Sequence, residues 1–331
     1  MTEPRVAAAA LTPARHTSDL ARIGGRDRSA ARPGPGPIAD RLVRQLELSL
    51  DRRVGGRMSG DHLGRGHGQG LELDRIRPYE PGDDVRRIDW NATARTLVPQ
   101  VREDVPDRQL TAWLLLDHSP SMHFGTADRR KADVAEGAAL VVGRFAARRG
   151  NRLGVVTFGA DRETVSPPSG GNRGMLGLLR SIATEPPEEG GGETSPACAL
   201  GLVGAIRTTP GVVVIVSDFR GPRDWVPALT EVAGRHAVIA LEVTDPREDA
   251  LVDVGELTLV DPETGQTLRV DTGDRHLRTA FDAAASADRA ALAAVFRRLA
   301  IRHLRLSTDG PWLPALAKGF TRTPDRTGRP A

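Results

Sequence analysis

The sequence has almost no cysteine, since Cys198 is the single one in 331 residues. A lone cysteine forms no internal disulfide and no cysteine-cluster metal site, and it fits a reduced compartment. Long apolar runs are also missing, because no window approaches the roughly 18 to 20 consecutive apolar residues of a membrane span. The apolar stretch Val6–Leu11 is too short for the core of a secretory signal. We therefore expect a cytoplasmic protein with no membrane span.

Aromatic residues make up only 4% of the chain, and lysine is nearly absent, because only Lys131 and Lys318 accompany the arginines. The formal charge is +3 at pH 7, which is small for this length. No dense basic block with interleaved aromatics occurs, so we expect no nucleic-acid surface. A nucleic-acid adaptor built on scattered arginines would reveal itself by a steep salt dependence of binding.

Composition and periodicity divide the chain into a disordered tail, a small N-terminal extension, a main domain and a C-terminal tail: residues 1–37, 38–106, 107–320 and 321–331. The extension is expected to contain an amphipathic helix over residues 38–50, where leucine and isoleucine recur at fourfold spacing. Short strands are expected around residues 71–79 and 98–105.

In the main domain, strand-like apolar runs alternate with amphipathic helices. The runs are nearly continuous, as in strands of a parallel sheet covered on both faces. The alternation predicts an α/β fold with a Rossmann-like, mostly parallel sheet flanked by helices. Residues 256–260 and 267–270 should form an antiparallel hairpin at one end of this sheet. Residues 167–173 are expected to form a loop. The expected strands are 113–116, 152–158, 211–218, 237–243 and 303–306, and the expected helices are 130–149, 174–182, 196 onward, 224–233 and 276–301.

A carboxylate and two hydroxyls follow the first of these strands. Asp117 ends the run, and Ser119 and Ser121 come at alternate positions after it, in the pattern Asp-x-Ser-x-Ser. Open α/β sheets bind ligands outside the carboxyl ends of their strands. Carboxylate and hydroxyl oxygens are the ligands that Mg²⁺ prefers, so these residues predict half of a metal site. We expect Asp117 to face solvent, so that Asp117→Ala changes stability by about 1 kcal/mol or less.

Two later segments supply further oxygen donors. Asp218 closes the apolar run 211–218, and Thr194 follows the three glycines 190–192. With Asp117, Ser119 and Ser121 they make five donors at carboxyl-end loops. The alternative is that these residues only cap helices. A phosphate-binding loop at the glycines is not indicated, because the Gly-Lys-Ser/Thr sequence that it needs is absent.

The string Pro81–Arg95, PGDDVRRIDWNATAR, is the densest charge-and-turn segment. A mixed-sign cluster of this kind locks a loop by charge-assisted hydrogen bonds or binds a partner, and composition does not separate the two. We interpret Trp90 as an apolar anchor, so that Trp90→Ala should cost about 3 kcal/mol or more if the ring is buried. The residues singled out are Gly82, Asp83, Asp84, Arg86, Asp89, Trp90 and Arg95.

Both motifs resemble known families. Asp117, Ser119, Ser121, Thr194 and Asp218 resemble the metal-ion-dependent adhesion site of von Willebrand factor A domains, and the string at 81–95 is similar to the signature of the bacterial family catalogued as domain of unknown function fifty-eight. The resemblance covers roughly residues 56–320. It implies a von Willebrand factor A-type sheet, Mg²⁺ or Mn²⁺ bound by the five residues, and protein interactions alongside a MoxR-type AAA+ ATPase in complex assembly.

Two functions follow from this reading. The first is a non-catalytic module whose metal keeps an open position for an acidic residue of a protein partner. The alternative is a metal-dependent hydrolase or phosphatase with Asp117 as the nucleophile, which needs a general acid or base beside it. His118 is the candidate for that role. Because it is an x position of the motif, we expect it to point away from the converging oxygens.

Overall fold

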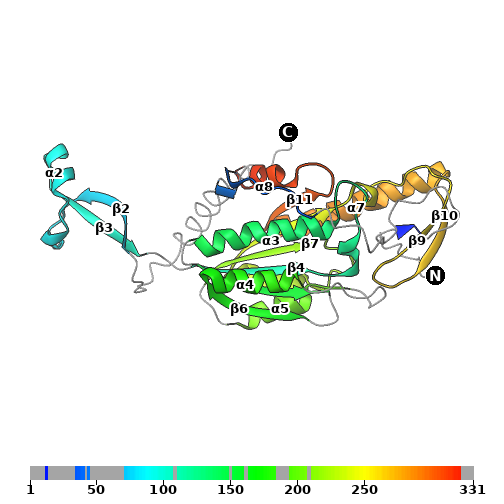
Figure 1. Ribbon diagram of the computed structural model, residues 1–331, viewed down its shortest axis with the longest axis horizontal. Helices are drawn as coiled ribbons and strands as arrows, with labels where there is room; N and C mark the ends of the chain where they lie inside the picture. The colour runs from blue at the N-terminus through cyan, green and yellow to red at the C-terminus, as the bar shows by residue number, and fades with distance from the viewer. Residues whose placement is uncertain are drawn as a thin grey trace. The chain divides into compact units, whose positions relative to one another are not determined.

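The computed structural model describes residues 12–13, 34–41, 43–44, 71–106, 110–148, 151–159, 163–183, 194–206 and 210–321. The chain forms two units, one made of Met1–Arg57 with Leu110–Ala331 and the other of Met58–Gln109 (Figure 1). The smaller unit is therefore an insertion into the larger one. The sequence had suggested an extension that begins earlier, at residue 38.

The segment ahead of this insertion packs within the larger unit. The predicted helix over residues 38–50 is helical at residues 40–41 and 43–44 but not at 38–39, and its remaining residues lie outside the described ranges. Val43 is fully buried, and Arg144 donates to Asp40 at 2.6 Å. The backbone oxygen of Pro35, in the predicted disordered tail, accepts a 2.8 Å hydrogen bond from the Trp312 indole. Most of that tail, like residues 322–331, lies outside the described ranges.

A six-stranded sheet forms the centre of the larger unit, in the order β11-β8-β7-β4-β5-β6. All neighbouring pairs are parallel except β5 with β6, which is antiparallel. The predicted class, a mostly parallel sheet flanked by helices, is confirmed. The strands are β4 (Thr111–Asp117), β5 (Arg152–Phe158), β6 (Thr164–Gly170), β7 (Val212–Ser217), β8 (Ala237–Thr244) and β11 (Arg302–Ser307).

The two central strands are buried along their whole length, as their continuous apolar runs predicted. Trp113, in β4, is fully buried. Its ring lies over Gly154 of β5, where a Cβ atom would come within 2.6 Å of two ring carbons. A glycine is therefore needed at that position of β5 for the indole to fit against the sheet.

Helices cover both faces of the sheet (Figure 1). One face packs against α5 (Ala197–Ala205), α6 (Val226–Arg235) and α7 (Arg275–Arg298), whose apolar residues share a core with the sheet. The helices α3 (Lys131–Arg148), α4 (Gly171–Ile182) and α8 (Trp312–Thr321) pack on the opposite face. Among the residues that the structure describes, no helix is long and apolar enough to cross a membrane.

Three segments of the larger unit differ from the sequence-based expectation. Residues 164–170 form the edge strand β6, although most of that stretch was expected to be loop. The hairpin of β9 (Glu256–Val260) and β10 (Thr267–Asp271) is antiparallel as predicted, but it joins a separate three-stranded sheet with β1 (Thr12–Pro13). Helix α8 was not expected. It begins two residues after Gly310, and its row of apolar residues is short.

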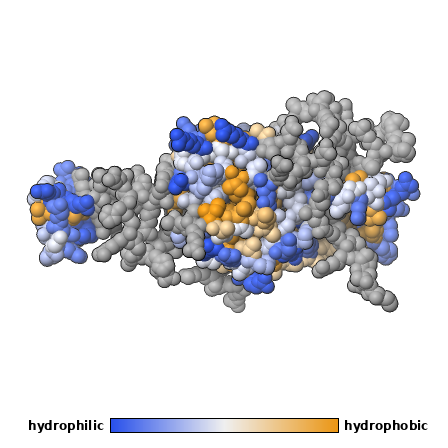
Figure 2. Space-filling model, turned by 90° about the horizontal axis from the view of Figure 1, so that it is seen from below, coloured by the Kyte–Doolittle hydropathy of each residue, from blue (hydrophilic) through white to orange (hydrophobic). Residues whose placement is uncertain are grey.

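Apolar side chains are exposed on one face of the larger unit. Figure 2 shows them gathered near the middle of that face. The exposed large apolar residues of β6 and α4 are Val165, Leu176 and Leu179. Single exposed apolar residues are normal on protein surfaces, but a gathering of them marks a candidate contact surface.

The smaller unit is a two-stranded antiparallel ribbon, β2 (Leu71–Pro78) with β3 (Gln100–Pro106), that carries one short helix. The string 81–95 contains a 3-10 turn, η1 (Val85–Arg87), and the helix α2 (Trp90–Thr96). Both begin at an aspartate whose side chain accepts a backbone N–H, Asp84 at 2.9 Å and Asp89 at 3.0 Å. Such caps account for two of the three acidic residues of the string.

Trp90 does not anchor this unit, so that prediction was wrong. Its side chain is the first of α2 and is 70% exposed. A ribbon of two strands and one short helix has little interior, and Val101 is its buried apolar residue in the described part. A helix that starts at an exposed turn directs its first side chain outward.

We predict that Trp90→Ala changes the free energy of unfolding by about 0.5 kcal/mol or less, because an exposed ring loses little contact when it is removed. Val101→Ala in β3 is the matched control and should destabilise the same unit more. Chemical denaturation of both variants, followed by circular dichroism, measures the difference. A loss near 3 kcal/mol for Trp90→Ala would show that the ring is covered after all.

A candidate metal site at the carboxyl edge of the sheet

The parallel register of β4 and β7 brings the ends of these two strands together. Leu116 pairs with Val216, so the next residues, Asp117 and Ser217, are neighbours. The Ser217 hydroxyl donates to Asp117 Oδ2 at 2.5 Å, and the Ser119 backbone N–H donates to Oδ1 at 2.8 Å. Asp117 is only 5% exposed. The expectation that it faces solvent was therefore wrong.

The two serines and the second aspartate continue from Asp117 as a chain of oxygen contacts. Ser119 Oγ lies 3.0 Å from Ser121 Oγ, and the Ser121 hydroxyl donates to Asp218 Oδ2 at 2.8 Å. All three side chains are buried. Asp117, Ser119, Ser121 and Asp218 thus lie together, although they come from two strand ends and a 3-10 turn, η2 (Pro120–His123).

Thr194 joins this group through a residue that the sequence reasoning missed. Its hydroxyl donates to Glu263 Oε2 at 2.7 Å, and the backbone N–H of Ser121 donates to Glu263 Oε1 at 3.2 Å. Glu263 lies in the turn between β9 and β10. The five predicted donors therefore meet at one edge, with a sixth oxygen-bearing side chain among them.

These oxygens fit a small divalent cation. An octahedral Mg²⁺ with bonds of about 2.1 Å places neighbouring ligand oxygens about 3.0 Å apart. The Ser119–Ser121 and Ser121–Asp218 contacts, at 3.0 and 2.8 Å, have that spacing. In the described part of the chain, no group of three or more His, Cys, Asp or Glu side chains is arranged to hold a metal. A cation at this edge would therefore depend on the hydroxyl oxygens.

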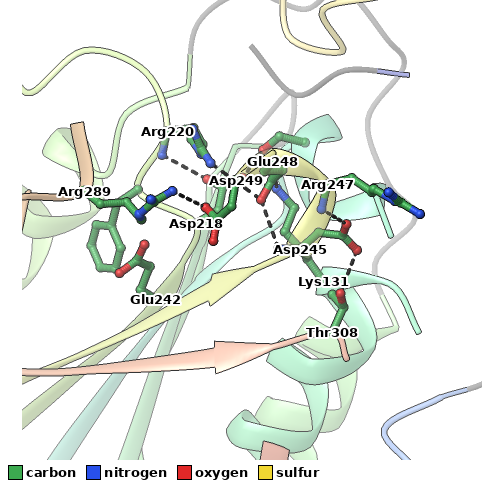
Figure 3. A network of polar contacts seen from close by, with 12 residues as sticks. Lys131, Asp218, Arg220, Glu242, Asp245, Arg247, Glu248, Asp249, Arg289 and Thr308 are labelled. Atoms are coloured by element: carbon green, nitrogen blue, oxygen red, sulfur yellow. Dashed lines mark hydrogen bonds and ion pairs between the residues drawn. The ribbon is translucent and has the colours of Figure 1, made fainter. Parts of the chain in front are cut away.

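A buried lysine contacts one of the aspartates of the site. Lys131, the first residue of α3, is fully buried, and its Nζ atom contacts Asp218 Oδ2 at 2.6 Å and Glu248 Oε1 at 2.5 Å (Figure 3). Arg220 adds a longer contact to Glu248 at 3.8 Å. Two carboxylates can hold one ammonium away from water when the remaining hydrogen-bonding capacity is also satisfied.

The turn after β8 holds Glu248 in place. Asp245 and Glu248 cap the 3-10 turn η3 (Pro246–Glu248) reciprocally, each accepting a backbone N–H of the other's segment. Asp245 also accepts from the Thr126 and Thr308 hydroxyls, at 2.5 and 2.6 Å. Burial would raise the pKa of Asp245, but these hydrogen bonds outweigh it and lower the pKa. The network in Figure 3 therefore ties three loops to the edge of the sheet.

The two aspartates of the site titrate in opposite directions. Burial, together with the charge of Asp218, raises the pKa of Asp117 to about 7. Burial also opposes ionisation of Asp218, but the charge and hydrogen bond of Lys131 outweigh it and lower the pKa of Asp218. The negative charge of Asp218 is thus balanced by Lys131. Asp117 has only hydroxyl and amide partners among these contacts.

Phe219 shows how the backbone turns Asp218 toward the site. Its φ of 53° is unusual for a bulky side chain. The ring is buried against Trp225 and Phe296, with centroid distances of 5.8 and 5.1 Å. Aromatic packing on one side of the strand end therefore offsets the strain of the turn that presents the carboxylate on the other.

His118 lies on a different side of the strand end. It lines a small pocket with Asp117, His123 and Glu136, together with residues of α3 and α4. Neither serine hydroxyl, nor Asp218 or Glu263, lines that pocket. His118 thus lines a pocket that does not include the converging hydroxyls.

The seven residues singled out in the string 81–95 belong to the smaller unit, and their contacts within that unit are as follows. Asp83 accepts two 2.7 Å hydrogen bonds from Arg77 of β2, and these hold the pKa of Asp83 below its usual value. Gly82 has a φ of 113°, which glycine alone adopts easily. Arg86 and Arg95 are exposed.

The fold and this edge define an α/β protein that gathers carboxylates and hydroxyls at the carboxyl ends of parallel strands. The chain belongs to the family described as Protein of unknown function DUF58, whose model matches residues 75–291. The family expected from the string 81–95 is thus confirmed. Uncharacterised proteins from Mycobacterium bovis (Mb1516) and Mycobacterium tuberculosis H37Rv (Rv1480) are each 40% identical over 276 residues, covering 83% of this chain and 87% of theirs.

Solved structures with a similar arrangement include two of low sequence identity. The conserved hypothetical protein BatB from Bacteroides thetaiotaomicron is 12% identical, with a TM-score of 0.37, over 64% of this chain and 97% of that one. The VWA domain of SpRpn10 is 11% identical, with a TM-score of 0.35, over 63% of this chain and 93% of that domain.

We predict that Lys131→Met lowers the free energy of unfolding by about 3 to 5 kcal/mol, because it leaves two buried carboxylates without their shared cation. Arg235→Met is the control, since Arg235 forms an exposed ion pair with Glu231 one turn away on α6. That pair should contribute about 0.5 kcal/mol or less. Urea denaturation compares the two, and equal losses would contradict the role given to Lys131.

Proposed function

We propose that this protein is a non-catalytic, divalent-metal-dependent protein-interaction module. Mg²⁺ or Mn²⁺ would be held by Asp117, Ser119, Ser121, Thr194 and Asp218. The observation that carries the proposal is the buried cluster at this edge: the Ser119 backbone N–H donates to Asp117, and the oxygens of Ser119, Ser121 and Asp218 follow at spacings of 3.0 and 2.8 Å. A bound cation would supply an open coordination position for an anionic group.

The charges around the edge support a divalent cation. The carboxylates of Asp117, Asp218, Glu248 and Glu263 lie within one network, and Lys131 and Arg220 are the cations that contact it. Asp117 and Glu263 are therefore the two carboxylates of this group without a basic partner, and both have a raised pKa. Unpaired buried charge is costly, and a divalent ion would balance it.

Two hydrogen-bond donors of this cluster suit an acidic partner residue. The Ser121 backbone N–H and the Thr194 hydroxyl both donate to one carboxylate, that of Glu263. A pair of such donors beside a cation is the chemistry that recognises an Asp or Glu side chain. We propose an acidic residue of a protein partner as the ligand.

The partner and the location are proposed from the family resemblance. A MoxR-type AAA+ ATPase is the expected co-worker, in the assembly or maturation of a protein complex in the cytoplasm. The alternative, a hydrolase or phosphatase that uses Asp117, is less well supported. Its nucleophile would have to be reached by His118, which lines a pocket that the serine hydroxyls and Asp218 do not line.

We predict that Mg²⁺ or Mn²⁺ binds the wild-type chain and not Asp117→Ala. The variant loses the carboxylate at the centre of the oxygen cluster, whereas Asp282→Ala, on the exposed surface of α7, should bind like the wild type. Isothermal titration calorimetry measures the binding. Equal isotherms for all three proteins would remove the metal from this site.

We also predict which residues are needed to capture the partner protein and which would be needed for hydrolysis. Asp117→Ala and Ser119→Ala should lose chelator-sensitive capture of the MoxR-type ATPase from the native host, and His118→Ala should keep it, because only the first two alter the cation. Co-purification with and without EDTA is the measurement. Metal-dependent turnover of a phosphate ester or a peptide that disappears in His118→Ala would instead establish the hydrolase.

A further inference from the structure

Glu263 sits at the tip of a turn that is fixed by its own hydrogen bonds. The Asp261 N–H donates to Gln266 O at 2.8 Å, and the Gly265 N–H donates to Asp261 O at the same distance. The Asp261 side chain accepts from the Glu263 N–H at 3.0 Å and from the Thr264 hydroxyl at 2.7 Å. The turn therefore keeps its shape without the side chain of Glu263, which is free to contact residues outside the turn.

The carboxylate of Glu263 is held by two residues of the proposed metal site. Oε1 accepts from the Ser121 N–H at 3.2 Å, and Oε2 accepts from the Thr194 hydroxyl at 2.7 Å. In the described ranges, no basic side chain forms an ion pair with it. Asp218 nearby carries the same charge, and burial with this repulsion raises the pKa of Glu263. The half-buried carboxylate of Glu263 therefore lies beside the oxygen cluster without a positively charged partner among these contacts.

We propose that Glu263 is the chain's own ligand for the metal site: its carboxylate occupies the position of the partner's acidic residue, and the β9–β10 hairpin closes the site until a partner displaces it. This inference rests on the proposed function and adds its regulation. It also describes the partner, which presents an Asp or Glu side chain from a turn or extended segment that replaces this hairpin tip.

The sheet topology allows the hairpin to withdraw. β9 pairs with β10 on one side and with β1 on the other, and neither β9 nor β10 pairs with the six-stranded sheet. Moving the tip therefore breaks the two hydrogen bonds of the Glu263 carboxylate but no pairing of the central strands. An internal ligand lowers the apparent affinity for a partner by the fraction of molecules in which the site is open.

The first test follows amide hydrogen exchange in the full chain, with Mg²⁺ alone as the probe. Mg²⁺ should slow exchange of residues 261–266 and of the Ser121 amide by about tenfold or more in the wild type, because the ion clamps the carboxylate. Glu263→Gln should lose this protection. Glu256→Gln, an exposed position on the same hairpin, should keep it.

The second test measures access to the site with a labelled peptide of residues 259–267, LVDPETGQT, by fluorescence anisotropy in Mg²⁺. Glu263→Gln should bind this peptide about tenfold or more tightly than the wild type, since the internal competitor is weakened. The same peptide with glutamine in place of its glutamate should not bind. EDTA should abolish the binding.

The results separate the two proposals. If calorimetry shows Mg²⁺ binding but the exchange of the hairpin is the same in the wild type and in Glu263→Gln, the internal ligand is overturned and the metal site stands. Equal peptide affinities for these two proteins would also overturn it. If no protein binds Mg²⁺ or Mn²⁺, the proposed function fails, and the internal ligand fails with it.

Discussion

The parallel register between β4 and β7 is the constraint on which the candidate site depends. Because Leu116 pairs with Val216, Asp117 and Ser217 become neighbours and Asp218 follows one residue beyond. A shift of one residue would turn every side chain of a strand to the opposite face. Trp113 of β4 also packs over Gly154 of β5, where a side chain would clash with the ring, so a shift of β4 would lose this fit. The same packing that forms the core therefore fixes which oxygens meet.

Lys131 shows how the chain places charge behind this edge. Its ammonium bridges Asp218 and Glu248, so that one aspartate of the cluster stays ionised within the fold. Asp117 has no such partner among its contacts, and burial raises its pKa. One carboxylate of the pair is therefore paired with a cation inside the protein, and the other is the one that the proposed metal ion would stabilise.

Much of the fold could be predicted from the sequence because the central strands are continuous apolar runs that end in polar residues. Asp117 and Asp218 stand directly after such runs, and for that reason their meeting was predictable. Glu263 and Lys131 were not, because they enter from a hairpin turn and a helix start that no periodicity connects to the strand ends. One signal was present for Lys131: a lysine is rare in a chain whose other basic residues are nearly all arginine. Trp90 was misjudged because composition does not reveal that the unit carrying it has almost no interior.

The two strands of the ribbon, β2 and β3, are the first and last elements of the smaller unit along the chain. Leu71 pairs with Pro106, so the first and last residues of that ribbon lie opposite each other. All of the family's signature string lies between them. The chain therefore returns close to the point at which the ribbon began, so this insertion leaves the strand order of the central sheet unchanged.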